Sequence, residues 1–218
     1  MPDGVGYGGA TRTGDEGVTR FTDAVTLAAE LHASQTRKAS AVPYIAHLLQ
    51  VCGLVLEDGG TEDEAIAALL HDAAEDQGGR ATLDRIHRRF GERVAEIVAG
   101  CSDAMPARGA AKAPWRERKE AYLDHLASAD PSVLKVSLAD RLHNGRSLLA
   151  DVAVRGDALW DRFNAPPADQ AWFYEASLAA YEFHAPDSWN LPAFREVARS
   201  VAAEARAAAG RAAARRRA

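Results

Sequence analysis

Hydrophobic residues recur every three or four positions along most of the chain, which predicts a succession of amphipathic helices. The first stripe contains Phe21, Val25 and Leu31. Similar patterns predict helices over residues 21–32, 44–57, 62–76, 82–90, 92–103, 115–129, 131–149, 168–184 and 192–209. No segment alternates apolar and polar residues as a half-buried strand does. We therefore predict an all-α fold, a helical bundle of about eight to ten helices.

Changes in composition divide this helical pattern into four parts. Residues 1–18 are rich in glycine and polar side chains and are predicted to form a flexible arm. Residues 19–155 hold the first helices and are predicted to form the core, and residues 156–209 are predicted to add C-terminal helices that pack on it. The Arg-rich residues 210–218 are expected to form a solvated tail.

Composition narrows the classes of function. The 218 residues carry a formal net charge of −5, and the chain has no general basic footprint for nucleic acid. No apolar run is long enough to cross a membrane, and the N-terminus lacks the pattern of a secretory signal, so we expect a cytoplasmic protein. Two isolated cysteines, Cys52 and Cys101, are expected to be buried thiols. Composition leaves the oligomeric state open between monomer and homodimer.

The string AALLHDAAEDQGG places four titratable side chains at the end of an apolar segment. On one continuous helix, His71 would share a face with Glu75, and Asp72 would share a face with Asp76. Because buried charges are costly unless they are paired or bind a metal, this cluster points to a cation site.

Two further strings strengthen that interpretation. PYIAHLLQV places His47 on an apolar helix, and SLADRLHN places Asp140 inside another. Together with His71 and Asp72 they make a mixed nitrogen and oxygen set that suits Mn²⁺, Fe²⁺ or Zn²⁺. A metal bound in this way lowers the pKa of water and polarises a phosphoryl oxygen, so the chemistry indicated is phosphoester hydrolysis.

The order His47, His71-Asp72, Asp140 resembles that of the HD superfamily of metal-dependent phosphohydrolases. The strings LHASQTRK, PYIAH, LLHDAAED and LADRLHN, within residues 20–150, resemble the hydrolase domain of RelA/SpoT-type proteins and the small alarmone hydrolases. This resemblance implies an HD-domain helical bundle in which those four residues bind one Mn²⁺. It also implies removal of the 3′-pyrophosphate from (p)ppGpp, which yields GDP or GTP and pyrophosphate.

The same resemblance implies roles for six further residues. Glu75 and Asp76 would position or deprotonate the attacking water. Contacts to the nucleotide would come from four residues: Arg37, Lys38, Asn144 and Ser147.

The chain departs from the family in two segments, and both departures bear on the substrate. Residues 39–42 read ASAV where the family has Ser-Gly-Glu or similar, and residues 100–106 read GCSDAMP in place of a DGVTK-like string. Two alternatives therefore stay open. One is an HD phosphohydrolase that acts on another nucleotide, such as ppApp or NADPH, and the other is a nucleotide-binding regulator without catalysis.

Several neighbouring residues are expected to have structural roles. His32 and His143 are predicted not to bind the metal. His143 lies about 100° around the helix from Asn144 and is expected to face elsewhere. Arg141 is predicted to form an ion pair with a helix carboxylate. Six aromatic residues are expected to pack the C-terminal helices onto the core: Trp160, Phe163, Trp172, Phe173, Tyr174 and Trp189.

Overall fold

A computed structural model describes residues 16–38, 40–102 and 113–216 of the chain, and these residues form helices connected by turns. The helices are α1 (Glu16–Leu31), α2 (Ile45–Glu57), α3 (Glu62–Leu70), α4 (Ala73–Asp76), α5 (Arg80–Phe90), α6 (Glu92–Cys101), α7 (Trp115–Leu126), α8 (Pro131–Arg155), the 3-10 helix η1 (Gly156–Arg162), α9 (Pro167–His184) and α10 (Leu191–Arg215). Over these residues the only β-type pairing is an isolated bridge between Thr36 and Pro43. The predicted all-α fold is confirmed.

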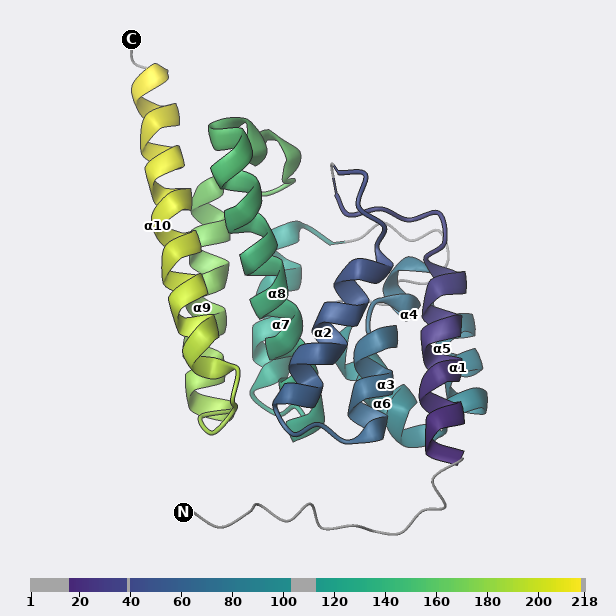
Figure 1. Ribbon diagram of the computed structural model, residues 1–218. Coiled ribbons are helices and arrows are strands. Elements are labelled where there is room, and N and C mark those ends of the chain that lie inside the picture. Colours follow the sequence, from purple (N-terminus) through teal and green to yellow (C-terminus); the bar gives the residue numbers. More distant parts are fainter. Residues whose placement is uncertain (1–15, 39, 103–112, 217–218) are drawn as a thin grey trace, which may run out of the picture.

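Helix α8 is the central element of the bundle (Figure 1). It packs against α2, α3 and α6 on one side and against α9 and α10 on the other. Ile66 and Leu69 of α3, Ile97 of α6 and Leu138 of α8 are completely buried where these helices meet. The burial of these side chains supplies the main stabilisation of the fold. It also places α8 between the N-terminal helices and the long hairpin of α9 and α10.

The helix predicted over residues 62–76 is broken in the structure, which corrects the expectation of one continuous helix. Its start has the predicted capping box, in which the hydroxyl of Thr61 accepts from the backbone of Glu64 and the Glu64 carboxylate accepts from Thr61. Helix α3 then ends at Leu70, because Asp72 adopts φ −92° and ψ −6°, outside regular helical geometry. A separate turn, α4, carries Glu75 and Asp76.

A glycine in the middle of α8 allows the close approach of the C-terminal helices. A Cβ atom at Gly145 would lie 2.4 Å from Cγ1 of Val197 and 3.0 Å from Cε1 of Tyr174. Both distances are too short for carbon atoms in contact. Gly145 therefore lets α9 and α10 pack directly against the helix that carries Asp140.

Both ends of the described chain are more helical than the sequence predicted. Helix α1 begins at Glu16, inside the segment expected to be a flexible arm, and residues 1–15 lie outside the described residues. Helix α10 continues to Arg215, beyond the expected end at residue 209. Arg211 and Arg215 form ion pairs with Asp157 of η1 at 2.6 Å and 2.5 Å. Contacts with η1 therefore hold part of the expected solvated tail.

The aromatic residues of the C-terminal helices mostly pack as predicted. Trp160, Phe173 and Tyr174 are buried in the core. Trp189 is the exception, since 72% of it is exposed. Its backbone N–H donates to Asp58 while its ring stays in solvent. Among the described residues, no helix has the length and apolar character needed to span a membrane.

Candidate metal centre

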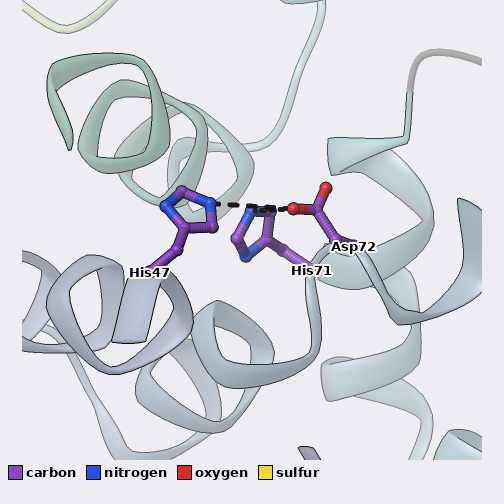
Figure 2. Close-up of side chains that lie close together, drawn as sticks. All are labelled: His47, His71 and Asp72. Carbon is purple, nitrogen blue, oxygen red and sulfur yellow. Dashed lines mark ion pairs between the residues drawn. The ribbon is translucent and has the colours of Figure 1, made fainter. Parts of the chain in front are cut away.

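Four side chains from three separate parts of the chain converge at the α3–α4 turn. His47 comes from α2, His71 and Asp72 form the turn itself, and Asp140 comes from α8. Nε2 of His47 lies 3.2 Å from Oδ1 of Asp140 and 3.7 Å from Oδ2 of Asp72. Nε2 of His71 lies 3.1 Å from Oδ2 of Asp72 and 3.6 Å from Oδ1 of Asp140. Figure 2 shows His47, His71 and Asp72 pointing toward one another.

This cluster fits a divalent transition metal. The Nε2 atoms of both histidines are buried, and neither makes a hydrogen bond within the described part of the chain. Potential ligand atoms of His47, His71 and Asp72 all lie within 4.8 Å of one another. A first-row dication binds such nitrogen and oxygen atoms at about 2 Å, which brings adjacent ligands to separations close to those observed here. His47, His71 and Asp72 can therefore bind one ion, and Oδ1 of Asp140 lies within 3.6 Å of both histidine nitrogens.

The electrostatics of the cluster favour positive charge. Burial would lower the pKa of His71, but the negative charges of Asp72 and Asp140 outweigh this effect and hold that pKa well above its ordinary value. Burial would likewise raise the pKa of Asp140, but His47 and His71 hold it well below the ordinary value of a carboxyl group. His71 and His47 lower the pKa of Asp72 in the same way, so both carboxyl groups are ionised, as ligation of a cation requires.

Hydrogen bonds fix which nitrogen each histidine presents to the cluster. Nδ1 of His71 lies 2.8 Å from the carbonyl oxygen of Ala68 and donates to it, so Nε2 is the nitrogen that faces the cluster. Nδ1 of His47 lies 2.7 Å from Nδ1 of His143. The expectation that His143 faces elsewhere is therefore wrong, although it is not among the converging ligands. Since His143 follows Asp140 by three residues, helical spacing places both on one face, and this signal was available in the sequence.

Tyr44 is a functional candidate that the sequence did not single out. Its hydroxyl donates to Oδ2 of Asp72 at 2.5 Å, the same oxygen that faces His71. Burial and the nearby charge of Asp72 raise the pKa of Tyr44, so it remains a donor. Tyr44 therefore orients a predicted metal ligand from outside the ligand set.

The two acidic residues of α4 lie at the edge of this centre. Glu75 and Asp76 line a cavity of about 200 Å³ together with His71, Asp72 and Asp140. Oδ2 of Asp76 accepts a hydrogen bond of 2.8 Å from Nε2 of Gln35. Cys101 also lines this cavity, but burial raises the pKa of its thiol and keeps it neutral, which makes it a poor metal ligand.

A second, larger cavity adjoins the first. Its volume is about 530 Å³, and all four predicted substrate-binding residues line it: Arg37, Lys38, Asn144 and Ser147. Nη2 of Arg37 donates to Oδ1 of Asn144 at 2.7 Å, and Nδ2 of Asn144 donates to Oδ1 of Asp140 at 2.6 Å. A chain of hydrogen bonds therefore links the larger cavity to the metal centre.

Side chains outside the predicted set of site residues also contribute to these cavities. Arg141 and Lys119 line both cavities. Nη2 of Arg141 lies 3.8 Å from Oδ2 of Asp140, the ion pair expected from the sequence, and its guanidinium lies 4.6 Å from the centre of the Phe173 ring. Phe163 and Tyr174 complete the wall of the larger cavity. Their contribution depends on α9 and η1 folding back onto α8, which periodicity alone does not predict.

The two departures from the family pattern are only partly visible. Ser40 and Val42 of the ASAV segment line the larger cavity, and residue 39 lies outside the described residues. Most of the GCSDAMP segment, residues 103–106, also lies outside them.

Comparison with known proteins places this geometry in context. A model of the HD domain matches residues 24–165. The guanosine-3′,5′-bis(diphosphate) 3′-pyrophosphohydrolase MESH1 of Xenopus tropicalis is 36% identical over 129 residues, which cover 58% of this chain and 68% of that protein. The bifunctional (p)ppGpp synthase/hydrolase SpoT of Escherichia coli K12 is 34% identical over 140 residues, which cover 62% of this chain and only 19% of SpoT.

Solved structures share the same fold. A metazoan ortholog of SpoT, described as hydrolysing ppGpp, superimposes with a TM-score of 0.66 at 22% identity and covers 88% of this chain and 98% of its own. The protein lmo0812 of Listeria monocytogenes EGD-e gives a TM-score of 0.61 at 23% identity over 72% of this chain and 98% of its own. These similarities confirm the helical architecture.

Proposed function

The protein belongs to the HD-domain family, whose fold is that of metal-dependent phosphohydrolases, and from this we propose that it removes the 3′-pyrophosphate of guanosine bis-diphosphates. The products would be GDP or GTP and pyrophosphate. The observation that carries the proposal is the juxtaposition of the His47, His71, Asp72 and Asp140 cluster with a larger cavity lined by cations. The names of the MESH1 and SpoT relatives support this choice of substrate.

The metal proposed for the cluster is Mn²⁺. Two imidazoles and two carboxylates form a mixed ligand set that suits Mn²⁺ as well as other first-row dications. When bound, the metal would lower the pKa of a water molecule and polarise a phosphoryl oxygen.

The side chains around the centre would perform the remaining steps. Glu75 and Asp76 would accept the proton of the attacking water, since both line the cavity that also contains His71, Asp72 and Asp140. Arg141 and Lys119 reach the same cavity and would offset the charge of the pyrophosphate as it leaves. Arg37 and Asn144 would hold the nucleotide at the junction of the two cavities.

A substrate panel tests this function directly. Purified protein is stripped with a chelator, loaded with Mn²⁺, Zn²⁺, Co²⁺ or Mg²⁺, and incubated with ppGpp, ppApp or NADPH. Chromatography measures the release of pyrophosphate. We expect release from ppGpp, at the highest rate with Mn²⁺, and no release by the stripped protein. Turnover of ppApp or NADPH without turnover of ppGpp would contradict the proposed substrate. Tight nucleotide binding without turnover of any of the three would contradict the proposed hydrolysis.

A further inference from the structure

We propose that Asp151 is the residue that selects a guanine base in the larger cavity. This inference rests on the proposed function, because it assigns the base subsite of the same substrate. The carboxylate of Asp151 would accept hydrogen bonds from the N1–H and 2-amino groups of guanine.

The first support is the position of Asp151 on α8. Starting from Asp140, the spacings to Asn144, Ser147 and Asp151 are four, three and four residues, which keeps all of them on one face of the helix. Asp140 belongs to the metal cluster, and the other three residues line the larger cavity. With a rise of 1.5 Å per residue, Asp151 lies about 16 Å along the helix axis from Asp140. A single helix face therefore runs from the metal centre to the far end of the cavity.

The second support is the distribution of charge between the two cavities. Lys119 and Arg141 line both cavities and lie where the phosphates of a nucleotide would approach the metal. Asp151 and the half-buried aromatic ring of Phe163 line the larger cavity but not the smaller one. A carboxylate repels phosphate but tolerates a neutral base, and an aromatic ring offers a surface on which a base can stack. The part of the larger cavity that Asp151 lines therefore suits a base better than a phosphate.

The third support is the chemistry of the two purines. A carboxylate accepts hydrogen bonds and donates none. Guanine presents two adjacent donors, N1–H and the 2-amino group, whereas adenine presents an acceptor at N1 that a carboxylate would oppose. A bidentate contact of this kind gives strong discrimination between bases. Asp151 therefore favours guanine over adenine.

The acceptor capacity of Asp151 remains largely unused within the described residues. Its nearest charged partner is Nε of Arg155, 3.6 Å from Oδ1, a weak ion pair between residues one helical turn apart. The side chain of Asp151 is 39% exposed, so this pair contributes little to stability. Replacing Arg155 removes the ion pair while it keeps the carboxylate, which provides a matched control.

The test compares the wild type with Asp151→Asn and Arg155→Gln. For each protein, kcat/KM is measured for ppGpp and ppApp in Mn²⁺, and the affinities for GDP and ADP are measured by calorimetry. Because an asparagine amide both donates and accepts, Asp151→Asn should lower the ratio of kcat/KM for ppGpp over ppApp by roughly tenfold to a hundredfold. The affinity ratio of GDP over ADP should fall in parallel, and Arg155→Gln should change neither ratio by more than about twofold.

The outcomes separate this inference from the proposed function. If the wild type hydrolyses ppGpp but Asp151→Asn leaves both ratios unchanged, the role of Asp151 is wrong and the proposed function stands. If no substrate is hydrolysed but the preference for GDP over ADP depends on Asp151, the proposed function fails and the base subsite stands. Equal changes of the two ratios in Asp151→Asn and Arg155→Gln would also overturn the inference. They would show that any disturbance at this end of α8 alters the preference, and not the loss of the carboxylate.

Discussion

The two adjoining cavities are built in different ways. The smaller one, of about 200 Å³, is lined by three residues of the metal cluster, His71, Asp72 and Asp140, and by the acidic pair of α4. The larger one, of about 530 Å³, combines cations from the loop before α2 with aromatic rings from the C-terminal half of the chain. Close contacts between histidine and carboxylate side chains constrain the first, whereas the second includes the exposed side chains of Lys38 and Val42.

This difference predicts that the smaller cavity carries out hydrolysis and that the larger cavity selects the substrate. Changes in the smaller cavity should lower kcat for every substrate by a similar factor. Changes in the larger cavity should act on KM and on the ratio between substrates. The comparison fails if replacing a residue that lines only one cavity, the predicted metal ligand His47 excepted, gives the kinetic change expected for the other cavity.

The largest effect is expected from Asp72→Asn in the metal cluster. The amide is a weaker metal ligand than the carboxylate, so bound metal should be lost and kcat/KM should fall by at least about a thousandfold. Metal content by mass spectrometry and pyrophosphate release measure the two effects. The matched control is Asp84→Asn, which alters an exposed carboxylate on α5 that is paired with Arg80. A variant with normal metal content and activity would exclude Asp72 from the site.

Glu75→Gln should separate proton transfer from metal binding. Because Glu75 lines the cavity without being a predicted ligand, the variant should retain its metal while kcat falls by roughly a hundredfold or more. The reduction should be the same for every substrate that the protein hydrolyses. Loss of metal in this variant would show that Glu75 belongs to the ligand set.

Arg37→Ala is the matching change in the larger cavity. Its guanidinium donates to Asn144, and we expect the loss of this cation to raise KM by about tenfold while kcat changes less. Arg80→Ala, which removes an exposed arginine of α5, is the control. Initial rates over a range of ppGpp concentrations distinguish the two parameters. A fall in kcat at unchanged KM would show that Arg37 acts in the hydrolysis step and not in substrate binding.

Gly145→Ala should produce the smallest change in activity and act mainly on stability. The added methyl group would meet Val197 and Tyr174, so the C-terminal helices must shift, at a cost of about 1–3 kcal/mol in the free energy of unfolding. Since Tyr174 lines the larger cavity, KM should rise while metal content stays normal. Urea denaturation measures the first effect and steady-state kinetics the second. Unchanged stability would mean that the helices tolerate closer contact than Gly145 suggests.

The sequence was sufficient to predict the helical fold and the convergence of the four cluster residues. Periodicity located most helices, and the order of the HD-type strings indicated which histidines and aspartates meet. It did not predict the break between α3 and α4, because the string ALLHDAAED has good helical pattern on both sides of Asp72. The tertiary contacts of Asp72 override that local preference.

The remaining differences concern pairs of residues far apart in the chain. His143 contacts His47 across 96 positions, and Tyr44 contacts Asp72 across 28. Such pairs depend on how α2, α8 and the α3–α4 turn pack, which a single sequence does not specify. Only the spacing of three between Asp140 and His143 gave a local signal for one of them.

The segment that connects α1 to α2 has a consequence for how this protein can vary. Gln35, Arg37 and Tyr44 lie within ten residues, and they hydrogen-bond to Asp76, Asn144 and Asp72 respectively. Surface loops usually tolerate insertions and deletions. Here a change of one residue in the length of this segment would displace Gln35, Arg37 or Tyr44. It would therefore disturb contacts to the acidic pair, the nucleotide cavity and the metal cluster at once. We therefore expect the deletion of one residue within 40–42 of this chain to change metal binding and nucleotide binding together.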